Sequence, residues 1–326
     1  MNKEFERRSK EVFEVLSILV KIDKRIIFLG GSAIQATLPE QKRLSIDLDI
    51  SYSDEIDKLI RGLENAGYVV LKRKSRNPIF VFYTVTNKDV MVKLDITRLS
   101  ITETEKRLIK DFEVLLPTQR YFLASKLSSL AFGTIGRLAE EQSQIMKDIF
   151  DINCLLDNEP SLEKMKEDWH KIISDQNRLR NTNHKEVQCA EDVQKTLLKC
   201  IDAVPFPSFF ITQNSLGSFQ DTLVKGKVLR QDLATMSARA LLLLANMDSN
   251  FYEFEARVLS GATDPKKLEE AEKVLLAKHI TNADQLRTLK LIVPRALLYL
   301  FYWIRKRRGD DPVTTNTEGA HNSRYS

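Results

Sequence analysis

The chain has 326 residues, long enough for two domains, and its 43% hydrophobic and 29% charged residues are ordinary for a soluble globular protein. The 50 Lys and Arg against 45 Asp and Glu give a formal net charge of +5, which suits a nucleotide or RNA partner but is equally usual for a solvated surface. The three cysteines lie far apart without a Cys-x-x-Cys or Cys/His cluster, which argues against a disulfide framework or a zinc site and favours a reducing cytoplasm.

Residues 1–100 alternate between short β patterns and amphipathic helical patterns, which predicts a mixed α/β core. Helices are predicted at 5–20, 32–38 and 54–65, the last with Ser53 as its N-cap and Gly67 as its stop. Strands are predicted at 25–29, 44–51, 68–72, 79–85 and 90–97, the last two joined as a hairpin across residues 87–89.

From about Thr102 onward the pattern is almost entirely helical. Apolar stripes at 123–130 and 145–156, with glycines between them, predict a helical hairpin over 101–158. A helical domain is expected over 159–308, with helices at 185–204, 234–247, 265–279 and 284–305, and a disordered polar tail over 309–326. The predicted fold class is therefore α+β.

No membrane segment is expected. The most apolar window, 289–304, is interrupted by Lys290, Pro294 and Arg295 and is short for spanning a bilayer, so it predicts a buried helix. The first residues include acids and lack the apolar core of a signal peptide. We therefore expect a cytoplasmic protein with no membrane partner.

Three acids occupy corresponding faces of two predicted strands. Asp47 and Asp49 share the polar face of strand 44–51, opposite Ile46, Leu48 and Ile50, and Asp95 lies on the polar face of strand 90–97. If the two strands are neighbours, the three carboxylates converge, and hard divalent cations prefer such oxygen ligands. The alternative is a set of solvent-exposed acids, with Asp95 paired to Lys93.

Gly30-Gly31-Ser32 stands between a predicted strand and a predicted helix. Glycines allow the backbone to approach a ligand closely, and a helix N-terminus offers free N–H groups to a phosphate. The Ser32 hydroxyl could add one hydrogen bond. The alternative is a tight turn without a ligand, but the sequence Arg43-x-Ser45-x-Asp47-x-Asp49 downstream makes a phosphate site more specific.

In chain order, the motifs GGSAI, RLSIDLDI, VKLDI, LASKL and MKDIFDI resemble those of nucleotidyltransferases of the AbiEii abortive-infection toxin type. That family is similar in fold to DNA polymerase β, and its relatives include the MenT toxins of type IV toxin–antitoxin pairs. The resemblance covers about residues 25–157. The gap between Ser32 and Asp47 is longer than is common in the family, and Ser125 stands where the family often has Glu.

The resemblance implies roles for Asp47, Asp49, Gly31, Ser32, Lys126 and Asp148, and the residue patterns add Gly30, Arg43, Ser45 and Asp95. Asp49, Lys126 and Asp148 are the expected catalytic residues, and Asp47, Asp49 and Asp95 are the expected ligands of Mg²⁺ or Mn²⁺. The expected nucleotide-binding residues are Gly30, Gly31, Ser32, Arg43, Ser45 and Lys126.

Lys126 and Asp148 flank the two apolar stripes of the predicted hairpin, so both could face one cleft. Lys126 would neutralise triphosphate charge, and Asp148 would orient Lys126 or act as a base on the acceptor hydroxyl. The alternative is a purely structural Lys126–Asp148 salt bridge. Asp151, one turn further, is either a helix-surface acid or a partner of these groups.

The predicted reaction is transfer of a nucleoside monophosphate from an NTP to an acceptor hydroxyl, with release of pyrophosphate. The resemblance implies the 3′ end of tRNA as acceptor and a cognate antitoxin as partner. Two alternatives stay open at this point: the acceptor is a protein side chain or a small molecule such as an antibiotic, or the chain is a non-catalytic binding scaffold.

Overall fold

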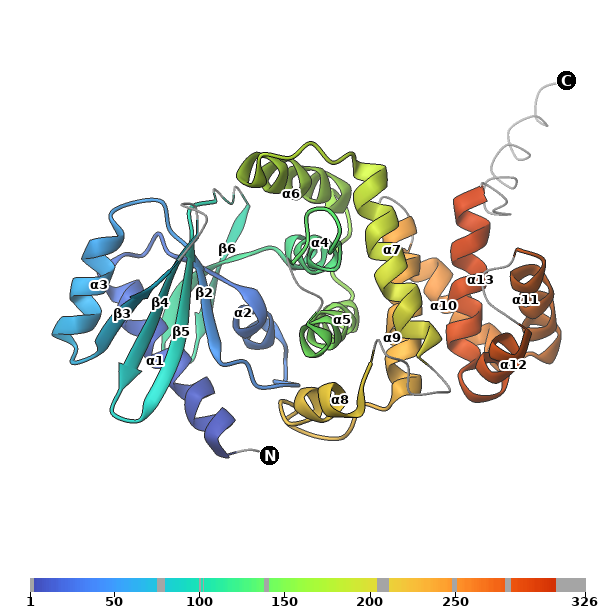
Figure 1. The fold of residues 1–326 in the computed structure, drawn as a ribbon, viewed down its shortest axis with the longest axis horizontal. Coiled ribbons are helices and arrows are strands. Elements are labelled where there is room, and N and C mark those ends of the chain that lie inside the picture. The colour runs from blue at the N-terminus through green and yellow to red at the C-terminus, as the bar shows by residue number, and fades with distance from the viewer. Residues whose placement is uncertain are drawn as a thin grey trace, which may run out of the picture. The chain divides into compact units, whose positions relative to one another are not determined.

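The computed structural model describes residues 3–74, 80–99, 101, 103–137, 141–203, 211–247, 251–278 and 283–308 (Figure 1). Two compact units divide the chain. The first is Met1–Val193 with Thr212–Val228, and the second is Gln194–Ile211 with Leu229–Ser326. The tail predicted to be disordered, 309–326, lies outside the described residues.

The first unit is built on a seven-stranded mixed sheet with the order β3-β4-β5-β2-β1-β7-β6. Neighbouring strands are antiparallel except for the parallel pairs β2–β5 and β1–β7. The strands are β1 (Ile27–Leu29), β2 (Asp47–Ser51), β3 (Val69–Arg73), β4 (Phe80–Asn87), β5 (Val90–Thr97), β6 (Thr104–Ile109) and β7 (Phe112–Pro117). This sheet and the helices described below confirm the predicted α+β class.

One face of the sheet carries its apolar core because side chains alternate along each strand. Leu48 and Ile50 of β2 and Leu94 of β5 are fully buried. Helix α1 (Lys3–Ile22) packs on β5 and β2 and buries an apolar stripe that includes Leu16 and Leu19. The acids of β2 and β5 are thereby left on the opposite face.

The prediction of an almost entirely helical chain from Thr102 onward is wrong, because β6 and β7 form an antiparallel hairpin there. Phe112, Val114 and Leu116 of β7 are buried in strict alternation. By contrast, β6 is an edge strand whose middle residues, Glu105–Leu108, are exposed. Charged side chains on an edge strand discourage pairing with other chains, and they also hide its alternation in the sequence.

The remaining helices of the first unit are α2 (Gly30–Thr37), α3 (Ile56–Asn65), α4 (Gln119–Ser129), α5 (Gln142–Leu156), α6 (Met165–Arg180), the first part of α7 (Glu186–Asp202) and α8 (Gln213–Gln220). Helix α2 packs on β2 and β1, and α5 contacts α2, α4 and α8. The predicted hairpin of helices thus exists as α4 and α5. Ser53 does not cap α3, which begins at Ile56 after an N-cap at Glu55.

The second unit is helical and contains the last part of α7 together with α9 (Arg230–Ala245), α10 (Phe251–Gly261), α11 (Pro265–Ala277), α12 (Ala283–Ile292) and α13 (Pro294–Arg308). The single helix predicted over 284–305 is two helices, because Pro294 cannot continue α12 and instead starts α13. Residues 294–304 are largely buried, as predicted for this apolar window. None of the described helices combines the length and the apolar character needed to cross a membrane.

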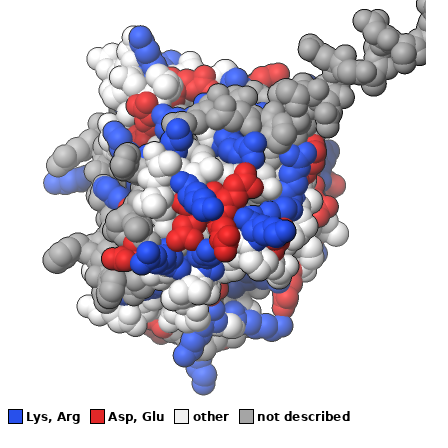
Figure 2. Space-filling view, turned by 90° about the vertical axis from the view of Figure 1, so that its right-hand side faces the viewer, with Lys and Arg blue, Asp and Glu red and all other residues white. Residues whose placement is uncertain are grey.

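Charges of both signs mix on the face of the second unit that carries α11 and α13 (Figure 2). Lys290 and Glu272 form an ion pair of 2.8 Å, and Arg305 and Glu270 form one of 3.7 Å. Lys and Arg side chains surround a group of acids on this face, which therefore differs from a uniformly basic surface.

Candidate active site

The three predicted acids come together on neighbouring strands. In the parallel β2–β5 pair, Asp49 lies directly opposite Asp95, and Asp47 lies opposite Lys93. The expected neighbourhood of the two strands is confirmed. Burial, followed by the charges of Asp95 and Asp47, raises the pKa of Asp49 to about 7, and burial also raises the pKa of Asp95 to about 6. The site thus concentrates negative charge that the chain itself only partly neutralises.

Two of these carboxylates hold oxygen atoms that make no hydrogen bond in the described structure. Oδ1 of Asp47 and Oδ1 of Asp95 are both buried, and the latter has an ion pair of 3.6 Å with Nη1 of Arg73. Such atoms cost free energy unless a cation or donor arrives, so this donor set fits a hard divalent ion. Among the described residues no group of three acidic, histidine or cysteine side chains forms a ready-made metal cage. An ion at this place would therefore need further oxygen ligands, such as those of a bound phosphate.

The glycine turn is required by the close approach of two side chains. Gly30 has a φ of +71°, and a Cβ atom at this position would collide with the carboxylate of Asp49. A Cβ at Gly31 would collide with Nη2 of Arg43 and would lie 3.2 Å from Oγ of Ser45. The predicted turn therefore seats the N-terminus of α2 against the acids. No side chain caps this helix N-terminus, so its N–H groups are available to an anion.

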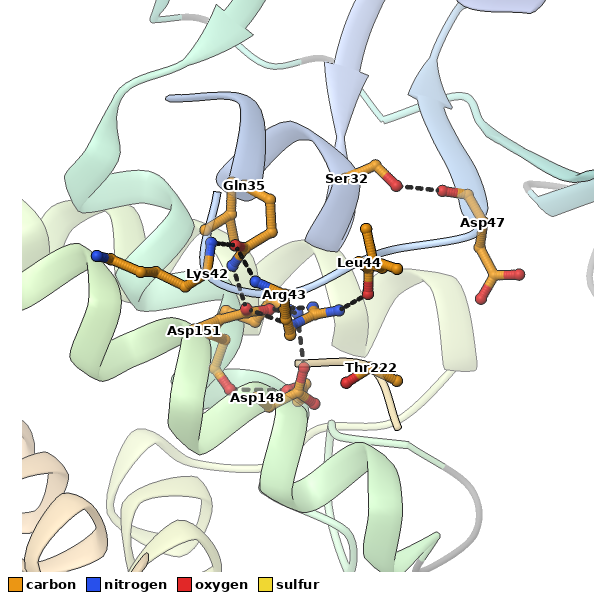
Figure 3. Close-up of polar contacts among 12 residues, drawn as sticks. Ser32, Gln35, Lys42, Arg43, Leu44, Asp47, Asp148, Asp151 and Thr222 are labelled. Carbon is orange, nitrogen blue, oxygen red and sulfur yellow. Dashed lines mark hydrogen bonds and ion pairs between the residues drawn. The ribbon is translucent and has the colours of Figure 1, made fainter. Parts of the chain in front are cut away.

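The hydroxyl of Ser32, predicted to contact a phosphate, is buried between α2 and β2. Its Oγ donates a hydrogen bond of 2.6 Å to the carbonyl oxygen of Asp47, and only 2% of the residue is exposed (Figure 3). Ser32 does not line the cavity described below. In this geometry its hydroxyl fixes the start of β2 relative to α2, and phosphate binding by Ser32 stays a prediction.

Arg43 is locked by Asp151 of α5. Its Nε and Nη2 donate to Oδ1 and Oδ2 of Asp151 over 2.8 and 2.6 Å, and Nη1 donates to the carbonyl oxygen of Leu44 over 3.2 Å (Figure 3). Gln35 of α2 also donates to Asp151 and accepts the backbone N–H groups of Lys42 and Arg43. Asp151 is fully buried, so it is a partner of these groups and not a helix-surface acid.

Lys126 and Asp148 meet as predicted. Nζ of Lys126 donates to Oδ1 of Asp148 over 2.6 Å and lies 3.0 Å from Oδ2 of Asp151. Asp148 also accepts from Oγ of Ser129 at 2.8 Å and from the guanidinium of Arg137 at 3.1 to 3.3 Å. Burial alone would raise the pKa of Asp148, but the charges of Lys126 and Arg137 hold it well below its usual range.

Most of the predicted site residues line a cavity of about 470 Å³ in the first unit, which is within the usual size range of small-molecule sites. The predicted residues that line it are Gly30, Gly31, Arg43, Ser45, Asp47, Asp49, Asp95 and Lys126. Asp148 and Ser32, also predicted, do not line it, and neither does Asp151.

Sequence reasoning missed two kinds of lining residue, cations and aromatic rings. Cations are added by Arg137 and Lys147, and a pair of rings is added by Phe80 and Phe82. Burial, followed by the charge of Arg43, lowers the pKa of Lys147. Its position directly before Asp148 in the MKDIFDI motif was the available signal. Arg180 of α6 also lines the cavity and donates to the carbonyl oxygens of Thr134 and Gly136.

Residues 15–241 match the sequence model of the family described as nucleotidyl transferase AbiEii toxin, Type IV TA system. This match spans more than half of the chain, and the chain therefore belongs to that family of nucleotidyltransferase toxins of type IV toxin–antitoxin systems. No curated protein matches it. Among solved structures, the crystal structure of JHP933 from Helicobacter pylori is similar at 14% identity and a TM-score of 0.45, covering 81% of this chain and 100% of that one.

Proposed function

We propose that the protein transfers a nucleoside monophosphate from an NTP to an acceptor hydroxyl and releases pyrophosphate. One observation carries the proposal: one cavity holds only partly neutralised carboxylates on β2 and β5 beside a group of cations on α4, on α5 and on the loop between them. The cations would balance the charge of a triphosphate, and the acids would hold divalent ions beside the reacting phosphate. Family membership supports this class of reaction.

The triphosphate would lie between the N-terminus of α2 and the cations Lys126, Arg137 and Lys147. The uncapped N–H groups of α2 attract anions, and the three cations balance the charge of the β- and γ-phosphates. Burial lowers the pKa of Lys126, but the charges of Asp148 and Asp151 more than offset this and raise it, so Lys126 stays protonated.

Asp47, Asp49 and Asp95 are the residues that would hold Mg²⁺ or Mn²⁺, with phosphate oxygens completing the ligand set. A bound divalent ion would neutralise charge on the reacting phosphate and align it. The buried Oδ1 atoms of Asp47 and Asp95, which accept no hydrogen bond in the described structure, support this assignment.

The acceptor hydroxyl would attack the α-phosphorus of the NTP. Its oxygen forms the new bond to phosphorus, the bond to the bridging oxygen of the β-phosphate breaks, and pyrophosphate leaves. The proton of the hydroxyl passes to a cavity carboxylate.

Asp148 does not suit the role of base that the family motif allowed. It lies outside the cavity lining, and Lys126, Ser129 and Arg137 already donate hydrogen bonds to it. The alternative role, orienting a cation, fits better: Asp148 holds Lys126 and Arg137 at the cavity wall. In the same way, Asp151 holds Arg43.

For the acceptor we propose the 3′ end of tRNA, with a cognate antitoxin protein as the regulator and the cytoplasm as the compartment. The membership in a family of type IV toxins supports the antitoxin, and the net charge of +5 is compatible with RNA. A protein or small-molecule acceptor is the competing assignment for the same cavity. A non-catalytic scaffold is disfavoured because the acids and the cations are both present.

The test is incubation of the purified protein with each labelled NTP, Mg²⁺ and total tRNA. We expect label on tRNA with the wild-type protein and with Asp89→Asn, which changes an exposed acid of the β4–β5 turn. Asp49→Asn should leave the tRNA unlabelled. Label on a protein or a small molecule instead would replace the acceptor, and no transfer to any acceptor would refute the transferase.

A further inference from the structure

Beyond the acids, the sheet carries two aromatic rings that do not belong to its core. Phe80 and Phe82 lie on the same side of β4, and their rings are stacked with centroids 6.3 Å apart and planes 5° apart. Phe82 lies opposite Asp95 in the β4–β5 pair. The core residues of β4 are Tyr83 and Val85, which are buried on the other face, whereas both stacked rings are half-buried and line the cavity.

Cations flank this ring pair. Arg73 of β3 lies opposite Phe82, with its guanidinium carbon 5.4 Å from the ring centroid and its Nη1 3.6 Å from Oδ1 of Asp95. Lys93 of β5 is exposed and lies two residues from Asp95 on the same face. We call Arg73, Phe80, Phe82 and Lys93 the aromatic face. It combines stacked rings with two positive charges beside the acids.

The sheet stays open beyond the aromatic face. Leu71 of β3 and Met91 of β5 share its side of the sheet and are 61% and 41% exposed. An extended ligand that enters the cavity over β4 can therefore continue along the sheet without displacing a helix.

The order of the strands separates the two ends of the cavity. The acids lie on β2 and β5, β4 borders β5 on one side, and β1 with α2 borders β2 on the other. In an in-line displacement the attacking and leaving oxygens lie on opposite sides of the phosphorus. If the leaving pyrophosphate lies towards α2 and the cations of α4 and α5, the attacking hydroxyl enters from the side of β4.

We propose that the aromatic face binds the single-stranded 3′ end of an RNA acceptor, with its terminal bases stacked on Phe80 and Phe82 and its 3′-hydroxyl directed to Asp95 and Asp49. Aromatic rings on an open sheet face stack bases, and neighbouring cations contact the phosphates between them. The inference rests on the proposed transferase function and adds to it the residues that receive the acceptor.

The test measures equilibrium binding to the full-length protein of two labelled ligands, a short single-stranded RNA with a free 3′-hydroxyl and an NTP with Mg²⁺. Phe80→Ala and Phe82→Ala should each weaken RNA binding by about tenfold, the usual loss for one stacked base, while NTP binding stays unchanged. Phe82→Tyr keeps the ring and should bind RNA as the wild type does. Leu108→Ala, at a 71% exposed apolar residue of the edge strand β6, is the control for general loss of apolar surface.

Thermal unfolding of each variant establishes that it is folded. If Phe82→Ala does not fold, Phe82→Leu decides, because it keeps apolar bulk but removes the flat ring and should still weaken RNA binding. Unchanged RNA binding in both alanine variants would overturn the inference, as would an equal loss of NTP binding or wild-type protein that binds NTP but no RNA. The inference would also be overturned if Phe80→Ala and Phe82→Ala lost binding to a protein partner while their RNA binding stayed intact. Wild-type protein that fails to bind NTP would instead refute the proposed transferase.

Discussion

Two pairs of aspartates in the first unit have opposite surroundings. Asp49 and Asp95 face the cavity, stand opposite each other, and have pKa values raised first by burial. Asp148 and Asp151 are fully buried, each bound to cations whose charge lowers its pKa despite burial. A buried carboxylate that accepts several hydrogen bonds from cations acts as a structural partner of those cations. Carboxylates that lie close together with few donors favour the binding of an added cation. Asp49 and Asp95 are therefore the acids of these two pairs that can take part in chemistry in the cavity.

The largest expected effect is the loss of activity on changing the first pair. Asp49→Asn keeps the size of the side chain but removes its charge and its capacity to accept a proton, so we expect nucleotide transfer to fall by at least about 100-fold. The same change removes a repulsion, so the thermal unfolding temperature should stay level or rise. Steady-state transfer and calorimetry on one preparation check both. Reduced stability of Asp49→Asn would mean that Asp49 stabilises the fold as Asp148 and Asp151 do, which would contradict the distinction between the two pairs.

Next in size is the loss of stability on changing the second pair. Asp148→Asn leaves the buried ammonium of Lys126 and the guanidinium of Arg137 without their shared carboxylate, which should lower the free energy of unfolding by about 3–5 kcal/mol. Urea unfolding at neutral pH measures this, with Asp89→Asn as the exposed control. A loss no greater than that of the control would mean that the pair is dispensable for the fold.

A smaller effect is expected where the geometry of the cation matters more than its charge. Arg43→Lys keeps the charge opposite Asp151 but loses the two-pronged contact, so we expect a destabilisation of about 2 kcal/mol. Arg43→Met should cost more, because it also leaves Asp151 with Lys126 as its one remaining cation among the described residues. Equal unfolding midpoints for Arg43→Lys and wild type would show that charge alone suffices at this position.

The smallest expected effect is a difference in pH dependence. The pKa of Asp49 rises on folding from its ordinary 3.8 to about 7, so the folded state binds this proton more tightly than the unfolded state. Its contribution to stability is fully present below about pH 4 and is lost as the pH rises through about 7. The lowered pKa values of Asp148 and Asp151 act in the opposite direction, losing stability as the pH falls. The difference between wild type and Asp49→Asn across this window isolates the first term, and a flat difference would contradict it.

The sequence was sufficient for those parts of the site that follow from local pattern. Strict alternation around Asp47 and Asp49 predicted a strand with its acids on one face, and the glycines predicted the turn before α2. The strand hairpin β6–β7 was missed because β6 is exposed and charged and shows no clear alternation. Pro294 interrupts the apolar window in the sequence, but the helix predicted over 284–305 continued through it, whereas in the structure Pro294 starts α13.

Side-chain partners could not be predicted in this way because they depend on distant segments. The Ser32 hydroxyl bonds to the backbone of Asp47, and the carboxylate of Asp151 binds a guanidinium 108 positions earlier in the chain. Local pattern shows that these groups are polar, but only the packing of α2 and α5 shows what each one meets. For the same reason Phe80 and Phe82 were predicted only as part of a strand and not as part of the site.

The loop that carries Arg43 is held by a segment from far along the chain. Arg43 forms an isolated bridge with Leu223, the N–H of Leu44 donates to the carbonyl oxygen of Thr222, and the N–H of Val224 donates to that of Lys42. The first unit therefore closes only when residues 212–228 return to it after the start of the second. During synthesis, the loop that carries Arg43 can therefore be clamped only after residue 224 of the 326 has been made.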